Sequence, residues 1–150
     1  MFTHKVVELS YLEQQLVYEA KRASKKAYCP ASKYSVGAAL KLDGPEIFTG
    51  ANIEVPCGQT LCAERVAIIS VLMSPKGIML RSKDDGQLGM MWLVVYTKDA
   101  APSCGICRHF MSQFAPLDLR VVSTDGVMAY HRTLKELYPY PFVRVYPDSA

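Results

Sequence analysis

The sequence lacks a long apolar run. No stretch approaches the 18 or more consecutive apolar residues that mark a transmembrane helix. The first residues, Met-Phe-Thr-His-Lys-Val-Val-Glu, also lack the apolar core and the small-residue cleavage site of a secretory signal peptide. These absences predict a cytoplasmic protein with no membrane partner. In that reducing compartment the five cysteines, an odd number, are expected to be thiols or metal ligands rather than disulfides.

The sequence also has little excess of either charge. Its 17 Lys and Arg residues outnumber its 14 Asp and Glu residues by only three, and half of all residues are hydrophobic, as in an ordinary globular protein. The basic residues are scattered, apart from one cluster between Lys21 and Lys26, which we interpret as the solvated face of a helix. The composition therefore disfavours a nucleic-acid polymer as a partner.

What is present predicts a single domain, residues 1–150, of helices and strands without internal repeats. Apolar residues three and four apart predict an amphipathic helix from Glu8 to Ala27, and Asp43-Gly44-Pro45 between two extended runs predicts a hairpin. The other predicted elements are helices at Cys62–Met73, Gly105–Ala115 and Thr133–Tyr138, and strands at Ser35–Leu42, Glu46–Ala51, Trp92–Thr97 and Leu117–Thr124. This order indicates an α/β fold with a mixed sheet sandwiched by helices. The stretch from Ser74 to Gly89 has loop composition.

Three cysteines in two segments carry the clearest chemical pattern. Cys104 and Cys107 are two residues apart, so both sulfurs can reach one ion, and Cys62 lies likewise at the predicted start of a helix. A helix N-terminus favours the deprotonated thiol, and thiolates are preferred ligands of Zn²⁺. Three sulfurs leave the fourth position of a tetrahedral zinc ion open for water, as in catalytic sites. The pattern therefore predicts one catalytic Zn²⁺ per chain.

Glu64, two residues beyond Cys62, indicates what that water is for. On the first turn of a helix its carboxylate can lie beside the metal without binding it, take a proton from the water and deliver it to a substrate. Cys-x-Glu followed by Cys-x-x-Cys is the pattern of zinc deaminases. Two other interpretations stay open. A lone Cys-x-x-Cys is also typical of a redox pair, and a closed structural zinc site would need a fourth ligand, for which His109 is the nearest candidate.

The chain around these residues resembles the cytidine deaminase family, specifically its small homotetrameric type. The resemblance extends from about Ala27 to Phe142. It implies a cytidine deaminase-like α-β-α sandwich with a five-stranded mixed sheet, a pyrimidine nucleoside as substrate, and a homotetramer whose sites are shared between subunits. It rests on the segments CPASKYSVGAAL (Cys29–Leu40), IFTGANIE (Ile47–Glu54), LCAER (Leu61–Arg65) and CGICR (Cys104–Arg108).

The same resemblance implies roles for further residues. Asn52 and Glu54 match the pair that binds the ribose 3′-hydroxyl; being two residues apart in a strand, they share one face. Arg65 matches an arginine that donates hydrogen bonds to the zinc thiolates and offsets their negative charge. The other positions implied to contact substrate are Ala63, Tyr34 beside the nucleoside, the carbonyl of Pro102 facing the leaving amine, and Phe142, which reaches a neighbouring subunit's site and stacks on the base.

Some features depart from the family pattern. Family members usually have proline directly before the first Cys-x-x-Cys cysteine, whereas Ser103 stands there in this chain and Pro102 precedes it. The restraint that proline places on φ has therefore moved by one residue. The segment Val55–Leu61 is shorter than usual and the segment Ser74–Gly89 is longer. These departures bear on rate and on substrate choice.

The sequence predicts hydrolytic deamination of cytidine and 2′-deoxycytidine to uridine and 2′-deoxyuridine, a pyrimidine salvage reaction. Three alternatives stay open. Deaminases of aminonucleoside antibiotics such as blasticidin S share the zinc motif, although Glu54 suits a plain nucleoside. A polynucleotide cytosine deaminase is disfavoured by the low charge and by the lack of an arginine and aromatic stripe. A zinc-stabilised domain that binds nucleosides or a partner protein without turnover would show the same cysteines.

Overall fold

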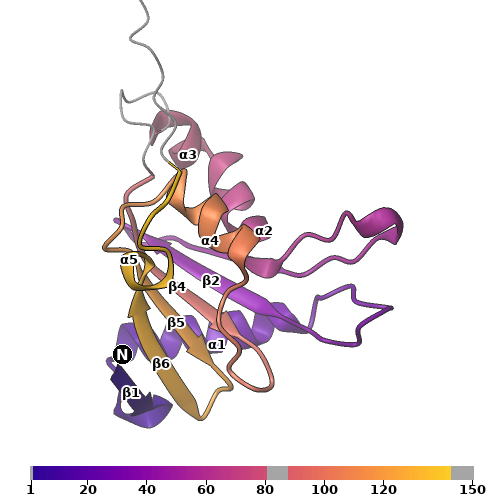
Figure 1. The fold of residues 1–150 in the computed structure, drawn as a ribbon. Coiled ribbons are helices and arrows are strands. Elements are labelled where there is room, and N and C mark those ends of the chain that lie inside the picture. Colours follow the sequence, from indigo (N-terminus) through magenta and orange to yellow (C-terminus); the bar gives the residue numbers. More distant parts are fainter. Residues whose placement is uncertain (1, 81–87, 143–150) are drawn as a thin grey trace, which may run out of the picture.

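A mixed β-sheet between two layers of helices forms the body of the protein (Figure 1). The computed structural model describes residues 2–80 and 88–142. Within these residues the sheet has six strands in the spatial order β1-β6-β5-β4-β2-β3, of which β4 and β5 run parallel and the other neighbours antiparallel. The strands are β1 (Phe2–Lys5), β2 (Gly37–Leu42), β3 (Ile47–Ala51), β4 (Met90–Tyr96), β5 (Arg120–Thr124) and β6 (Met128–Thr133).

Helices cover both faces of the sheet, which confirms the predicted α-β-α sandwich. Helix α1 packs on one face, and α2 and α4 pack on the other. In the described part of the chain, none of the helices combines the length and the apolar character that crossing a bilayer requires. The helices are α1 (Tyr11–Ser24), α2 (Ala63–Leu72), α3 (Pro75–Leu80), α4 (Gly105–Ser112) and α5 (Leu134–Leu137), with the short 3-10 helices η1 (Val6–Glu8) and η2 (Pro56–Gly58).

The expected number of five strands is wrong, because the described chain adds a strand at the edge of the sheet. β1 pairs antiparallel with β6, with Phe2 opposite His131 and Lys5 opposite Met128. At four residues, β1 is too short to show the alternation of a strand. β6 shows no alternation either, since only Ala129 is buried and its other side chains are partly exposed. The hairpin of β2 and β3 and the positions of β4 and β5 agree with the predicted strands.

The first helix begins later than predicted because Ser10 caps it. The Ser10 hydroxyl accepts a hydrogen bond from the backbone N–H of Glu13, and the Glu13 carboxylate accepts one from the N–H of Ser10. Glu8 lies before this cap, in η1. The basic cluster between Lys21 and Lys26 is exposed, as expected for the solvated face of α1.

The stretch from Ser74 to Gly89 is not all loop. Its first part forms α3, with Pro75 at the first helical position, where a missing amide donor costs nothing. The Ser74 hydroxyl accepts a hydrogen bond from the N–H of Gly77 at 3.0 Å and so supports the first turn. Residues 81–87 lie outside the described residues.

The alternating strand residues divide the core between the two helix layers. On β2, Ala38 and Leu40 pack toward α2 and α4, whereas Ala39 packs toward α1. On β4, Val95 packs toward α2 and α4, whereas Val94 packs toward α1. Burial on both faces explains why these strands have continuous apolar sequences. The chain leaves the carboxyl end of β4, returns through α4 and enters β5, so the loop before α4 lies where α/β sheets place their ligands.

Helix α2 lies very close to β3 at Gly50. A Cβ atom at this position would lie 2.3 Å from the carbonyl oxygen of Ala63 and 2.4 Å from the amide nitrogen of Ala67. Both are backbone atoms, so a side chain at residue 50 can be accommodated only by moving the helix. The first turn of α2 is therefore fixed directly on the sheet.

We expect Gly50→Ala to lower the free energy of unfolding by about 1–3 kcal/mol, the usual cost of overpacking, as measured by urea denaturation. Gly105→Ala is the matched control, because a Cβ there meets no atom within 4 Å and the position is helical. It should leave stability unchanged or slightly raised. Equal urea midpoints for the two variants would show that α2 is not held at this distance.

Candidate metal centre and adjoining pocket

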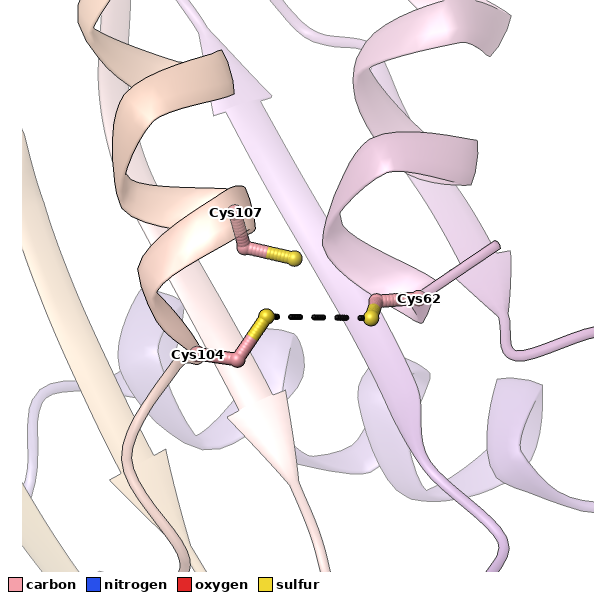
Figure 2. A group of neighbouring side chains, drawn as sticks. All are labelled: Cys62, Cys104 and Cys107. Atoms are coloured by element: carbon pink, nitrogen blue, oxygen red, sulfur yellow. Dashed lines mark hydrogen bonds between the residues drawn. The ribbon is translucent and has the colours of Figure 1, made fainter. Parts of the chain in front are cut away.

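The first turns of α2 and α4 bring three cysteine sulfurs together. Cys62 is the N-cap of α2, Cys104 is the N-cap of α4, and Cys107 lies one turn into α4. The three Sγ atoms lie within 4.8 Å of one another and point into a common space (Figure 2). All three residues are free cysteines, and the Cys62 and Cys104 sulfurs are 3.9 Å apart. Two helix N-termini thus direct their partial positive charge at one cluster of sulfurs.

The spacing and the chemistry of these sulfurs fit a zinc ion. Zn–S bonds of about 2.3 Å in tetrahedral geometry place two sulfurs about 3.8 Å apart, close to the 3.9 Å between Cys62 and Cys104. A hydrogen bond from the Cys107 thiol, with further help from Arg65 and Cys104, lowers the pKa of Cys62 to about 5. The same hydrogen bond, with burial and the Glu64 charge, raises the pKa of Cys107. One sulfur of the cluster is therefore a thiolate at neutral pH.

The geometry speaks against the two other interpretations of the cysteines. A redox pair needs two sulfurs, whereas three converge here. In the described part of the chain, the group that could hold a metal contains the three cysteines and no histidine. His109 instead lies with its Nδ1 3.5 Å from the Tyr138 hydroxyl oxygen. Three ligands leave a tetrahedral zinc ion with an open position, which is typical of a catalytic site.

A cavity of about 360 Å³ adjoins the cysteines, a size typical of small-molecule sites. Its lining comes from the loop before β2, the end of β3, the start of α2 and the loop after β4. The predicted residues Tyr34, Asn52, Glu54, Glu64 and Pro102 are all brought together here. The other lining residues are Ser32, Val36, Thr60, Cys62, Val95, Thr97, Ala101 and Cys104.

Glu64 is the buried acid of this pocket. It is only 4% exposed, on the first turn of α2. Burial, and then the charge of Cys62, raises the pKa of its carboxyl. A carboxyl whose pKa is raised by burial holds a proton more readily than an exposed one, which suits a group that both accepts and donates protons.

The profile of the cytidine and deoxycytidylate deaminase zinc-binding region matches residues 10–123, a span that includes the three cysteines and Glu64. The chain belongs to this deaminase family. Cytidine deaminase of Halalkalibacterium halodurans is 35% identical over 111 residues, which cover 72% of this chain and 76% of that protein. Blasticidin-S deaminase of Bacillus cereus is 28% identical over 119 residues, which cover 75% of this chain and 80% of that protein.

Solved structures of the deaminase family share the fold. The crystal structure of cytidine deaminase from Burkholderia pseudomallei superposes with a TM-score of 0.76 at 29% identity, over 89% of this chain and 100% of that one. Membership makes the chain a zinc-dependent hydrolase with a cytidine deaminase-like α/β fold, and the three-cysteine cluster is its zinc-binding site.

Asn52 and Glu54 of this family member hold the loop before β2 as well as lining the pocket. The Asn52 side chain accepts a hydrogen bond from the N–H of Val36 at 2.8 Å and donates one to the carbonyl of Tyr34 at 2.9 Å. The Glu54 carboxylate accepts hydrogen bonds from the hydroxyl and N–H of Ser32 and from the N–H of Ala31. These bonds, first that from the Ser32 hydroxyl, lower the pKa of Glu54. Sequence reasoning assigned these residues to the sugar alone and missed this second task.

Tyr34 is fixed by a residue that no sequence pattern indicated. Its hydroxyl donates a hydrogen bond to Asp99, in the loop between β4 and α4. Burial, together with this hydrogen bond, raises the pKa of Tyr34. The ammonium group of Lys98 lies 5.4 Å from the centre of the tyrosine ring. The hydrogen bond between Tyr34 and Asp99 joins two loops beside the pocket that are 65 residues apart in sequence.

Arg65 lies beside the metal ligands, whereas Ala63 and Phe142 lie outside the pocket lining. The Arg65 Nη2 atom is 3.9 Å from the Cys62 sulfur, and the same atom donates to the carbonyl of Thr60. Ala63 is fully buried against the sheet. The Phe142 side chain is 68% exposed, and its carbonyl accepts a hydrogen bond from Gln113. A role for Phe142 in a neighbouring subunit's site stays a prediction.

Proposed function

We propose that this chain catalyses the hydrolytic deamination of cytidine and 2′-deoxycytidine to uridine and 2′-deoxyuridine, with release of ammonia. The observation that carries the proposal is the position of Glu64. Its carboxyl is buried beside three sulfurs that fit zinc, and it lines the cavity that also contains Asn52 and Glu54. A proton-transferring group, a metal site and polar groups for a sugar thus share one pocket.

The proton transfers are assigned to Glu64. When held by the three cysteines, Zn²⁺ supplies Lewis acidity that makes a water molecule nucleophilic near neutral pH. As this water adds to C4 of the cytosine ring, the Glu64 carboxylate takes its first proton and passes it to N3. Glu64 then carries the second proton to the amino group, which leaves as ammonia and leaves the C4 carbonyl of uridine. The Glu64 carboxyl thus transfers both protons of the water, the first to N3 of the product and the second to the departing ammonia.

The other predicted residues orient the nucleoside in this proposal. Glu54 and Asn52 bind the ribose 3′-hydroxyl, and the ionised state of Glu54 is favoured by its lowered pKa. The carbonyl of Pro102 accepts a hydrogen bond from the leaving amine. Phe142 is proposed to stack on the base in a neighbouring subunit of a homotetramer.

Glu54→Gln should raise the KM for cytidine about tenfold or more while changing kcat by less than about threefold. Hydrogen bonds to a charged group contribute about 1.5–3 kcal/mol, and the amide keeps the size of the side chain without the charge. The expected result is therefore a loss of substrate binding, measured by initial rates at varied cytidine concentration. Glu46→Gln is the control, since Glu46 pairs with Lys76 outside the pocket. An unchanged KM would remove Glu54 from the sugar site.

A substrate panel tests the function itself. Purified protein is assayed with cytidine, 2′-deoxycytidine, blasticidin S and a cytosine-containing single-stranded oligonucleotide, and deamination is followed by ultraviolet absorbance and ammonia release. The proposal expects turnover of both nucleosides. Blasticidin S is the second candidate because of the 28% identity to the Bacillus cereus enzyme, and turnover of that compound alone would replace the proposal. Full zinc loading without turnover of any substrate would indicate a non-catalytic binding domain.

A further inference from the structure

The loop between β4 and α4 turns back on itself in a strained conformation. Thr97 fixes its start, because its N–H donates to the carbonyl of Thr124 at 3.0 Å and its hydroxyl accepts a hydrogen bond from the N–H of Ala101 at 2.7 Å. Between these contacts Ala100 has a φ of 53°, in the left-handed region that is unfavourable for a residue with a side chain. The loop continues directly to Pro102, the proposed acceptor of the leaving amine.

The loop before β2, on the other side of the pocket, is strained in the same way. Lys33 has a φ of 55° and directly precedes Tyr34. Within the described residues, three non-glycine residues have a positive φ, and two of them, Lys33 and Ala100, are the chain neighbours of Tyr34 and Asp99. The hydrogen bond from the Tyr34 hydroxyl to Asp99 therefore joins the two loops at their strained points. Such backbone conformations persist only where surrounding contacts hold them, and they are common at functional sites.

Tyr34 also belongs to the hydrogen-bond network of the residues proposed to bind the sugar. Its carbonyl accepts a hydrogen bond from the Asn52 side-chain amide at 2.9 Å, and its N–H donates to the Ser32 hydroxyl at 3.0 Å. The Ser32 hydroxyl in turn donates to the carboxylate of Glu54. A continuous chain of hydrogen bonds thus runs from the proposed sugar ligands through Tyr34 to Asp99.

We propose that Asp99 is a positioning residue that fixes the distance between the sugar-binding side of the pocket and the carbonyl of Pro102. A nucleoside held at its sugar by Asn52 and Glu54 presents its amino group at a set distance. Both ends can be bound at once only if the two sides of the pocket keep that separation. Asp99 lies outside the pocket lining and acts through Tyr34, which does line it. This inference rests on the proposed function.

The kinetic test is a double-mutant cycle on the hydrogen bond. Asp99→Ala should lower kcat/KM for cytidine about tenfold, the lower end of what a hydrogen bond to a charged group contributes. Tyr34→Phe keeps the ring but removes the hydroxyl, and should cause a similar loss. Asp99→Asn keeps an acceptor oxygen and should retain most of the parent activity. If the two residues act through one bond, the double variant is no worse than either single variant.

Asp118→Ala is the matched control, because Asp118 is an exposed aspartate in the segment between α4 and β5 and lies outside the pocket lining. Its kcat/KM should equal that of the parent. Unchanged kcat/KM in Asp99→Ala would overturn the inference, and so would losses that simply multiply in the double variant.

A second test is independent of turnover. Amide hydrogen exchange is followed by mass spectrometry in peptides that cover residues 31–36 and 97–102 of the full-length protein. Tyr34→Phe should speed exchange in residues 97–102 threefold or more, and Asp99→Ala should do the same in residues 31–36, because each loop then loses its tie to the other. Exchange that changes only in the mutated loop would overturn the inference. A protein that does not deaminate cytidine refutes the proposed function, whereas this measurement still decides whether the bond holds the two loops.

Discussion

Replacing Glu64 by glutamine is expected to lower kcat for cytidine by about 10²- to 10⁴-fold, the range attributed to general acid–base catalysis. The amide has nearly the size of the carboxyl group but cannot take a proton from water and release it to the ring. Because Glu64 is buried and is not one of the three sulfur ligands, zinc should remain at one per chain. The measurement is the initial rate of absorbance loss at saturating cytidine, with zinc determined on the same sample.

Glu46→Gln again serves as the control for removing a carboxylate, since Glu46 pairs with Lys76 and neither residue belongs to the pocket lining or to the cysteine cluster. Its kcat should equal that of the parent. Full activity of Glu64→Gln would assign the proton transfers to another group. Loss of zinc in that variant would instead mean that Glu64 supports the metal site.

Removing one sulfur of the cluster should have an even larger effect. Cys107→Ser is expected to bind less than one zinc per ten chains after dialysis and to have no measurable deaminase activity. A serine hydroxyl stays protonated at neutral pH and is a poor replacement for a soft thiolate. Since metal binding contributes free energy to the folded state, the midpoint of heat unfolding should also fall, and added zinc should not restore it.

Cys57→Ser provides the comparison, because Cys57 is an exposed free cysteine outside the cluster. It should keep its zinc, its activity and its unfolding midpoint. A strong chelator should bring the parent protein to the state of Cys107→Ser, and stoichiometric zinc should reverse that change. Activity that survives complete removal of zinc would contradict the metal-dependent reaction.

The metal site was predictable from sequence because its parts are local. Cys62 and Glu64 share one helix start, Cys104 and Cys107 share another, and helix starts are among the better marked positions in a sequence. The central strands were predictable for a similar reason, since burial on both faces gives continuous apolar runs. The residues alone could not predict β1 and β6, because one is too short to show a period and the other is buried at only one position.

Contacts between distant segments were beyond sequence reasoning. The pairing of Tyr34 with Asp99 depends on how two loops meet across 65 residues. The hydrogen bonds of Glu54 to Ala31 and Ser32 likewise join residues more than 20 positions apart. An aspartate after a strand or a serine in a loop has no local signal of such a partner. The zinc-binding cysteines could be found by spacing, but the bonds that shape the pocket required the three-dimensional structure.

The close contact between Gly50 of β3 and the backbone of α2 fixes the position of the helix start that carries Cys62 and Glu64. The segments that form the rest of the pocket have no such restraint and can vary more freely. The cysteines and Glu64 lie at the first turns of α2 and α4. The first turn of α2 packs directly on the backbone of the sheet. The groups that we propose to bind the sugar belong largely to connecting segments that are joined to one another by side-chain hydrogen bonds. Mutation of those segments can therefore alter which nucleoside is accepted while the reaction chemistry is inherited intact. An engineer seeking a new substrate should diversify residues 28–36 and 97–102 and leave Gly50 untouched.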